Sequence, residues 1–138
     1  MGVGEESGDI DAVAAMIASD EASRSLGMHV VSYGGGRAEV RMTVRPDMVN
    51  GYDIAHGGLV FALADTAFAA ACNSTAAPTV AAGAEIVFVA SARLGDELVA
   101  SAALRTSFGR NGVYDVTVRR GDDVIAEFRG RSHWLSPR

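Results

Sequence analysis

The residues that could do chemistry gather in one short part of the chain, between positions 50 and 65. They are an amide, an imidazole, two adjacent glycines and a carboxylate: Asn50, His56, Gly57, Gly58 and Asp65. Asp65 is the one ionisable carboxylate in the otherwise uncharged run GGLVFALADTAFAAACN, residues 57–73. Burying a lone carboxylate costs several kcal/mol unless something compensates for it. A chemical role would explain its presence.

Two interpretations of Asp65 are open from the residues alone. Its neighbours at i±3 and i±4 on a helix are all apolar: Phe61, Ala62, Phe68 and Ala69. Apolar surroundings disfavour the charged form, which makes a carboxylate a better base or nucleophile. In the other interpretation Asp65 is structural, either hydrogen-bonded by Thr66 or a backbone N–H, or pointing to solvent.

His56, Gly57 and Gly58 lead into the apolar run, which predicts a long helix over residues 57–75. The first N–H groups of a helix have no intrahelical acceptor. Together with the helix dipole they can bind a carbonyl oxygen that gains negative charge. A glycine at this point also lets a ligand approach the backbone closely. The alternative is that His-Gly-Gly only turns the chain into the helix.

Asp65 and Gly57 are too far apart on one helix to act on the same bond. At roughly 1.5 Å of rise per residue, they are separated by about 12 Å along the axis. If both groups serve one reaction, Asp65 must come from a second copy of the chain. A two-fold pairing of helices would then create two equivalent sites.

The composition excludes several classes of function. The formal net charge is -5 and there is no basic block, which disfavours nucleic-acid binding. All 12 basic residues are arginine, so Schiff-base chemistry, pyridoxal phosphate anchoring and a P-loop are excluded. Three scattered histidines (His29, His56, His133) predict no metal site. We expect Cys72 to be a small buried hydrophobe, and we expect no cofactor.

Residues 1–10 predict a disordered tail and residues 11–138 a single domain. The tail has neither the basic region nor the apolar core of a signal peptide. The single cysteine fits a reducing compartment, and no run is apolar enough to span a bilayer. We therefore expect a cytoplasmic protein without a membrane segment.

The elements that must position these residues follow from the hydrophobic pattern. Residues 11–25 predict one short amphipathic helix. The runs at 28–33 and 37–45 predict two strands joined at Gly34–Gly36. An irregular loop then leads into the apolar helix.

Four more strands are predicted after the helix, over residues 80–91, 96–108, 113–120 and 123–135. Their short, turn-rich connections predict antiparallel neighbours in a four-stranded meander. The predicted fold class is therefore α+β, with a long central helix wrapped by a curved antiparallel sheet and a short N-terminal helix.

At these residues the sequence resembles a known family. The stretch VRPDMVNGYDIAHGGLVFALADTAFAAACNS, residues 44–74, is similar to the signature of hotdog-fold acyl-CoA thioesterases of the phenylacetic acid degradation (PaaI) type. The resemblance continues through ARLGDELVASA, GRNGVYDVTV and AEFRGRSHW, and spans roughly residues 12–134. The spacing of Asn50, His56-Gly57-Gly58 and Asp65-Thr66 is its most specific part.

The resemblance implies a hotdog fold and subunits paired side by side as a homodimer, usually two pairs in a homotetramer. It implies hydrolysis of acyl-CoA, with aryl or arylacetyl esters such as phenylacetyl-CoA preferred, at a site between two chains. Coenzyme A is then part of the substrate rather than a cofactor. In such enzymes the glycine matching Gly57 donates its N–H to the thioester carbonyl, and the aspartate matching Asp65 is nucleophile or general base. Residues matching Asn50, His56 and Thr66 position the substrate or the water, and we place Gly58 with them.

Two segments depart from the family pattern. Tyr52-Asp53 stands where some relatives have a small residue or histidine, and Ala90-Ser91 replaces a basic-proline pair. These changes leave open which acyl group fits and what holds the coenzyme A phosphates. Arg110 and Asn111, in a predicted turn, are candidate phosphate contacts; the alternative is an ordinary solvated hairpin.

Two other functions are weighed against hydrolysis. A non-catalytic acyl-CoA sensor of this fold would be expected to carry a DNA-binding segment or to lack the carboxylate, whereas this chain retains Asp65. A hotdog dehydratase would call for a base elsewhere, commonly a histidine paired with an acidic residue. His56 has no such spacing.

Overall fold

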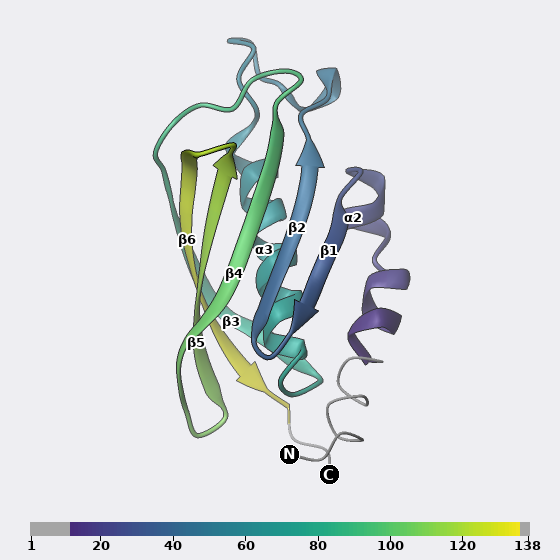
Figure 1. The fold of residues 1–138 in the computed structure, drawn as a ribbon, viewed down its shortest axis with the longest axis vertical. Coiled ribbons are helices and arrows are strands. Elements are labelled where there is room, and N and C mark those ends of the chain that lie inside the picture. Colours follow the sequence, from purple (N-terminus) through teal and green to yellow (C-terminus); the bar gives the residue numbers. More distant parts are fainter. Residues whose placement is uncertain (1–11, 136–138) are drawn as a thin grey trace.

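The structure is a computed structural model that describes residues 12–135 (Figure 1). The predicted tail, residues 1–10, lies outside them, as do both ends of the predicted domain. In chain order the elements are a helical stretch at residues 12–18, α2 (Glu21–Ser25), β1 (His29–Gly34), β2 (Arg37–Thr43), the 3-10 turn η1 (Pro46–Met48), α3 (Gly57–Asn73), β3 (Thr79–Phe88), β4 (Glu97–Phe108), β5 (Asn111–Arg120) and β6 (Asp123–Trp134).

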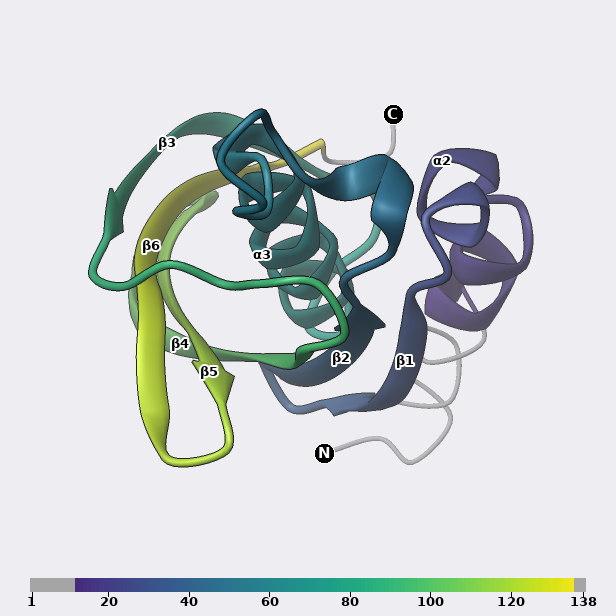
Figure 2. The same ribbon diagram turned by 90° about the horizontal axis from the view of Figure 1, so that it is seen from above.

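The six strands form one antiparallel sheet in the order β1-β2-β4-β5-β6-β3. The sheet curves around α3, as Figure 2 shows. Buried and more exposed residues alternate along β2 and β5, so one face of each strand packs on the helix. The predicted central helix in a curved antiparallel sheet is therefore confirmed. No helix in residues 12–135 is long and apolar enough to cross a bilayer.

Aromatic packing fixes how α3 is rotated against the sheet. The ring of Phe68 lies against Tyr114 and Phe128, with centroids 5.6 and 5.8 Å apart. It also approaches the backbone of β6 closely, since a Cβ at Gly130 would lie 2.8 Å from the Phe68 ring. This orientation leaves partial exposure on another side of the helix, at positions three or four apart: Gly58, Ala62, Asp65, Thr66 and Ala69. We call these five residues, which the sheet does not cover, the uncovered face of α3.

The predicted short N-terminal helix is present, but it is not continuous over residues 11–25 as expected. The helical stretch at residues 12–18 ends before Ser19, and α2 begins after Asp20. The Asp20 side chain caps α2, because its Oδ1 accepts a hydrogen bond from the Ser23 amide at 3.0 Å. A local cap at this position starts a second helix and interrupts the first.

The predicted four-stranded meander is also wrong. The strands β4, β5 and β6 are sequential neighbours, but β3 pairs with β6 at the far edge of the sheet, and β4 pairs with β2. The turn at Leu94–Gly95–Asp96 therefore does not join paired strands. Its Gly95 amide donates to the Val44 carbonyl at 2.9 Å, so it is held against the end of β2. Elsewhere the predicted elements are present, with ends that differ by up to three residues.

Candidate active site

The start of α3 presents free backbone donors. The residue before the helix is His56, whose amide donates to the Met48 carbonyl at 2.8 Å and whose side chain makes no capping hydrogen bond. Its carbonyl accepts from Leu59 and Val60 in the first helical turn. The amide of Gly57 belongs to the set with no intrahelical acceptor. The helix therefore begins at Gly57, as predicted.

Phe88 lies directly against Gly57. A Cβ on Gly57 would come within 2.9 Å of the Phe88 Cζ, whereas one on Gly58 would meet nothing within 4 Å. Phe88 is the last residue of β3, the edge strand, and its side chain is 52% exposed. The helix start and the free edge of the sheet therefore lie side by side.

The loop before α3 is shaped by Asn50. Its side-chain oxygen accepts from the amides of Tyr52 (2.8 Å) and Ile54 (3.2 Å). Its own amide donates to the Ile54 carbonyl at 2.8 Å. The loop includes Asp53 with a φ of 60°, a left-handed conformation that Asp tolerates better than most residues. In this chain the oxygen of Asn50 is thus committed to the loop, and its effect on α3 comes through the backbone.

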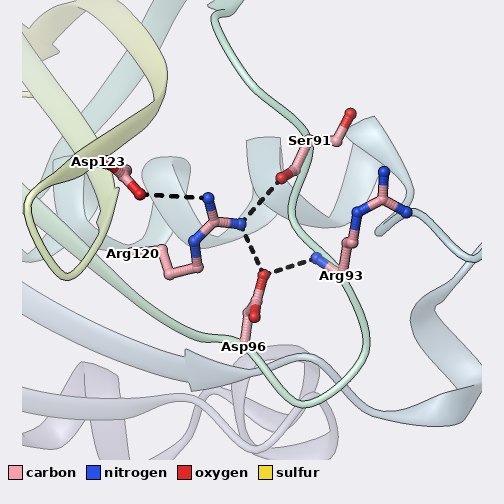
Figure 3. Close-up of polar contacts among 5 residues, drawn as sticks. All are labelled: Ser91, Arg93, Asp96, Arg120 and Asp123. Atoms are coloured by element: carbon pink, nitrogen blue, oxygen red, sulfur yellow. Dashed lines mark hydrogen bonds and ion pairs between the residues drawn. The ribbon is translucent and has the colours of Figure 1, made fainter.

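A second segment supports this loop from outside. The link between β3 and β4, residues 89–96, crosses the end of the sheet, and its Ala92 carbonyl accepts from the Ala55 amide at 2.8 Å. The link is tied down by Arg120, whose guanidinium donates to the Ser91 carbonyl (3.1 Å) and to Asp96 Oδ2 (2.9 Å), as Figure 3 shows. The residue two positions before Gly57 is therefore anchored through the link to β5.

The same cluster favours the ionised form of the Asp96 carboxyl. The Arg93 amide donates to Asp96 Oδ2 at 2.8 Å and Arg120 donates to the same oxygen (Figure 3). Both hydrogen bonds favour the ionised form, so the pKa of Asp96 lies below its usual range. The second nitrogen of Arg120 reaches Asp123 at 3.4 Å. Charge-assisted bonds of this kind hold the link in one conformation.

Asp65 stands at the midpoint of α3, on its uncovered face. Burial is the main cause that raises the pKa of its carboxyl, and the negative charge of Asp20 raises it further. No hydrogen bond contributes to this shift among the described residues. The Thr66 hydroxyl bonds to Ser23 at 2.9 Å. The interpretation that Thr66 satisfies Asp65 is therefore wrong for the described residues, and the carboxylate is half-buried.

Gly57 and Asp65 are eight residues apart on one straight helix. At roughly 1.5 Å per residue, about 12 Å separates them along the axis. Within one chain the structure does not bring the two groups together. It does place both where a second molecule can reach them, Gly57 beside the sheet edge and Asp65 on the uncovered face.

The candidate phosphate contacts lie at the other end of the molecule. Arg110 and Asn111 join β4 to β5 and line a small cavity with Cys72 and Thr75, near the C-terminal end of α3. Asn111 bonds to the His133 ring at 3.2 Å. In one chain they are therefore at the opposite end of α3 from Gly57, and any joint role requires a second chain.

Cys72 is buried on the sheet side of α3, with 2% of its surface exposed. Burial raises the pKa of its thiol to about 12, so the reactive thiolate does not form near neutral pH. Cys72 is a packing residue, as expected. Residues 12–135 contain no group of three His, Cys, Asp or Glu side chains that could hold a metal.

The sequence reasoning missed two residues beside the site, Asp20 and Ser23. The Ser23 hydroxyl donates to Asp20 Oδ2 at 2.6 Å and contacts Thr66 on α3. The signal was present as Asp-x-x-Ser, a pattern in which the first residue caps a helix through the third residue of its first turn. Reading residues 11–25 as one helix concealed it.

The comparisons with known proteins agree with this geometry. The sequence profile of the Thioesterase superfamily matches residues 52–127, more than half of the chain. The chain belongs to the Thioesterase superfamily. This thioesterase is 42% identical to the acyl-coenzyme A thioesterase PaaI of Escherichia coli (strain K12), over 86% of each protein.

Solved structures give the same result for this thioesterase. The structure of the E. coli PaaI protein from the phenylacetic acid degradation operon has a TM-score of 0.88 at 39% identity, covering 93% of this chain and 94% of that one. A mutant of the phenylacetic acid degradation protein PaaI from Thermus thermophilus gives 0.82 at 32%, covering 84% and 100%. The protein smu.793 from Streptococcus mutans UA159, bound to acetyl CoA, gives 0.76 at 27%, covering 80% and 90%. The predicted family, hotdog fold and enzyme class are confirmed.

Proposed function

We propose that the protein hydrolyses acyl-CoA thioesters at a site shared by two copies of the chain, with aryl or arylacetyl esters such as phenylacetyl-CoA preferred. The observation that carries this proposal is that one helix holds both a terminal amide, at Gly57, and a carboxylate of raised pKa, at Asp65. The identity to a PaaI thioesterase supports the acyl-CoA class, as does an acetyl CoA-bound structural relative.

The chemistry follows from these two groups. The thioester carbonyl oxygen accepts from the Gly57 amide of one protomer, where the helix dipole favours the negative charge that develops during attack. Asp65 of the other protomer acts on the carbonyl carbon, directly as nucleophile or through a water molecule as base. Its raised pKa makes it a stronger base than an exposed carboxylate. On the base route the C–S bond then breaks and releases the free acid and coenzyme A. On the nucleophile route the same cleavage releases coenzyme A and leaves an anhydride between the acyl group and Asp65, which water hydrolyses to the free acid.

A two-fold pairing of α3 helices meets the distance requirement. If two antiparallel helices bring Asp65 of one opposite Gly57 of the other, the axis passes midway between these positions, near residue 61. The uncovered face carries Gly58 and Ala62 there, and such small side chains let two helix backbones approach closely. The residues nearest the axis therefore fit the pairing that catalysis requires.

The edge strand β3 supports the same arrangement. It is the last strand of the sheet order, and several large apolar side chains on and just after it are exposed: Val80, Val87, Phe88 and Val89. Unpaired strand edges with apolar side chains bind other strands readily. Pairing of β3 with β3 of a second copy would cover them and bring the second α3 beside the first. We propose a homodimer of this kind, with homotetramers formed from two such pairs.

The test is release of thiol from a panel of acyl-CoA esters, with phenylacetyl-CoA included, by wild type and Asp65→Asn. We expect turnover by the wild type, fastest with arylacetyl esters, and a loss of at least about 100-fold in kcat for Asp65→Asn. Equal rates in the two proteins contradict the role of Asp65. Tight binding of acyl-CoA without turnover by the wild type would favour the sensor.

The shared site has its own test in mixed dimers. Asp65→Ala removes the base and Gly57→Pro removes the amide donor. A dimer with one change in each chain keeps one site built from the two intact halves. We expect each variant alone to be inactive and the mixture to recover activity as mixed dimers form. Mixed dimers without recovered activity contradict sharing.

A further inference from the structure

A cavity of about 460 Å³ lies between the N-terminal helical segments, β1 and α3. Most of its wall is apolar, but Asp20, Ser23 and Thr66 contribute polar atoms to it. Thr66 follows Asp65 directly in α3, and the negative charge of Asp20 acts on the Asp65 carboxyl. Asp65 itself does not line the cavity, but Thr66, the residue next to it, does.

Three polar side chains form a chain of hydrogen bonds along this wall. Asp20 Oδ1 accepts from the Ser23 amide at 3.0 Å, and Asp20 Oδ2 accepts from the Ser23 hydroxyl at 2.6 Å. The Ser23 Oγ is 2.9 Å from the Thr66 Oγ1. The chain thus runs from the cap of α2 across to the central helix.

The direction of each hydrogen bond is fixed by proton counting. An ionised carboxylate only accepts, so Ser23 donates its single hydroxyl proton to Asp20. Ser23 has no second proton, so Thr66 must be the donor in the bond between them. The Thr66 hydroxyl proton is then used, and the oxygen can only accept from a molecule in the cavity.

We propose that Asp20 and Ser23 are positioning residues that hold the Thr66 hydroxyl as an acceptor for the attacking water. This inference rests on the proposed thioesterase function and adds two residues from outside the helix. The water donates one hydrogen to Thr66 and the other to Asp65, so a lone pair of its oxygen is free for attack.

The step balances without any further reactant. The water oxygen bonds to the thioester carbon while one of its protons passes to Asp65, and the carbonyl oxygen takes negative charge. When that charge collapses back, the C–S bond breaks and the proton on Asp65 goes to the leaving sulfur. The products are the free acid and the thiol, and Asp65 is again ionised. Thr66 exchanges no proton and only orients the water.

Asp20→Asn reverses this chain without removing the cap. Asn caps helices about as well as Asp, and its oxygen must still accept from the Ser23 amide. The NH2 group then occupies the position of Oδ2 and donates to the Ser23 hydroxyl. Ser23 must donate to Thr66, and Thr66 must point its proton toward the water. The acceptor at the site becomes a donor, while the number of non-hydrogen atoms is unchanged.

The experiment is a double-mutant cycle on kcat and KM for thiol release, using wild type, Asp20→Asn, Thr66→Val and the double variant. We expect Asp20→Asn and Thr66→Val each to lower kcat about three- to tenfold, the range for one hydrogen bond, with KM nearly unchanged. The double variant should be no slower than Thr66→Val alone. Ser23→Thr, which keeps the hydroxyl, should retain the wild-type kcat.

The rates are compared on the plateau above the acid limb of the pH profile. Asp20→Asn also removes a negative charge near Asp65, which lowers the pKa of Asp65 and moves the acid limb to lower pH in both backgrounds. The other charged or titratable side chains that line the cavity are Arg24, His29 and Tyr33, and none of them is changed. The shift of the acid limb therefore measures the effect of the lost Asp20 charge, and the change in plateau kcat measures the effect of the reversed hydrogen-bond chain.

Three results would overturn the inference. The first is a plateau kcat of Asp20→Asn equal to that of the wild type, and the second is an equal further loss in the Thr66→Val background. The third is a kcat loss matched by a lower melting temperature, because that indicates a structural role. A wild type that releases no thiol from any acyl-CoA ester overturns the proposed function and this inference together. The other results leave the proposed function intact.

Discussion

One added methyl group at Gly57 tests whether the start of α3 is the oxyanion donor. In Gly57→Ala the new Cβ would lie 2.9 Å from the Phe88 Cζ. Carbon atoms normally pack at about 3.5 Å or more, so the ring or the helix start must move by about 0.6 Å. The amide is retained but is displaced from the carbonyl. A misplacement of about 1 Å can lower a rate about 100-fold, so we expect kcat/KM to fall about 10- to 100-fold.

The assay is the rate of thiol release from phenylacetyl-CoA, read with a disulfide reagent that the buried Cys72 does not reach. Gly58→Ala is the matched control for stability, since its Cβ meets nothing within 4 Å. It should gain about 0.5 kcal/mol from reduced backbone freedom, and Gly57→Ala should gain less. In a Phe88→Ala background the methyl group has room, so Gly57→Ala should change the rate by less than about threefold. Wild-type activity in Gly57→Ala, or a loss that persists without the Phe88 ring, refutes the reasoning.

Three further predictions concern Asp65, Cys72 and Ala62. Burial and the charge of Asp20 raise the pKa of Asp65, and the ionised form is the active one. We therefore expect kcat/KM to fall as pH drops through a value above about 3.9, the ordinary pKa of an aspartate; full activity at pH 4 would argue against it. Because the Cys72 thiol has a pKa of about 12, we expect it to take no part in the reaction, and Cys72→Ala should keep kcat within about twofold. In the folded wild type, mass spectrometry should find this thiol unmodified by iodoacetamide; rapid labelling would contradict this. Ala62→Arg places a charge on the uncovered face of α3 and should give an inactive monomer in light scattering; an active dimer would rule out the proposed pairing.

The central helix and the separation of Gly57 and Asp65 along it could be predicted from the sequence because both depend on local properties. A 17-residue helix whose only charged side chain is one carboxylate must be largely enclosed. The helical rise then fixes the distance between Gly57 and Asp65 without knowledge of the sheet. The strand alternation in β2 and β5 was equally readable, because one face of each is buried.

The strand order could not be predicted in the same way, because it depends on contacts far apart in sequence. The motif Leu94–Gly95–Asp96 has the residues of a hairpin turn. Here it closes against Val44, while the amides of Val89 and Ala90 both reach the Ile125 carbonyl. These bonds carry the chain across the end of the sheet. A short connection alone does not show which strand comes next to which.

The hydrogen-bond chain beside Asp65 was hidden for a related reason. Ser23 and Thr66 are 43 positions apart and belong to two helices. Their contact depends on the orientation of α2, which is set by the break in the helix at Ser19. That break follows from one side-chain cap, and the amphipathic pattern of residues 11–25 continues through it.

The exposed apolar edge at β3 has a consequence for the folding and degradation of the protein in the cell. In the proposed dimer a newly synthesised chain would carry this edge unpaired until it meets a second chain, and during that interval it could pair with the wrong strand. Folding yield and resistance to proteases should therefore rise with the amount of protein made, since assembly stabilises the folded state by mass action. If each active site needs two chains, the activity per molecule falls whenever the protein concentration is too low for dimers to form.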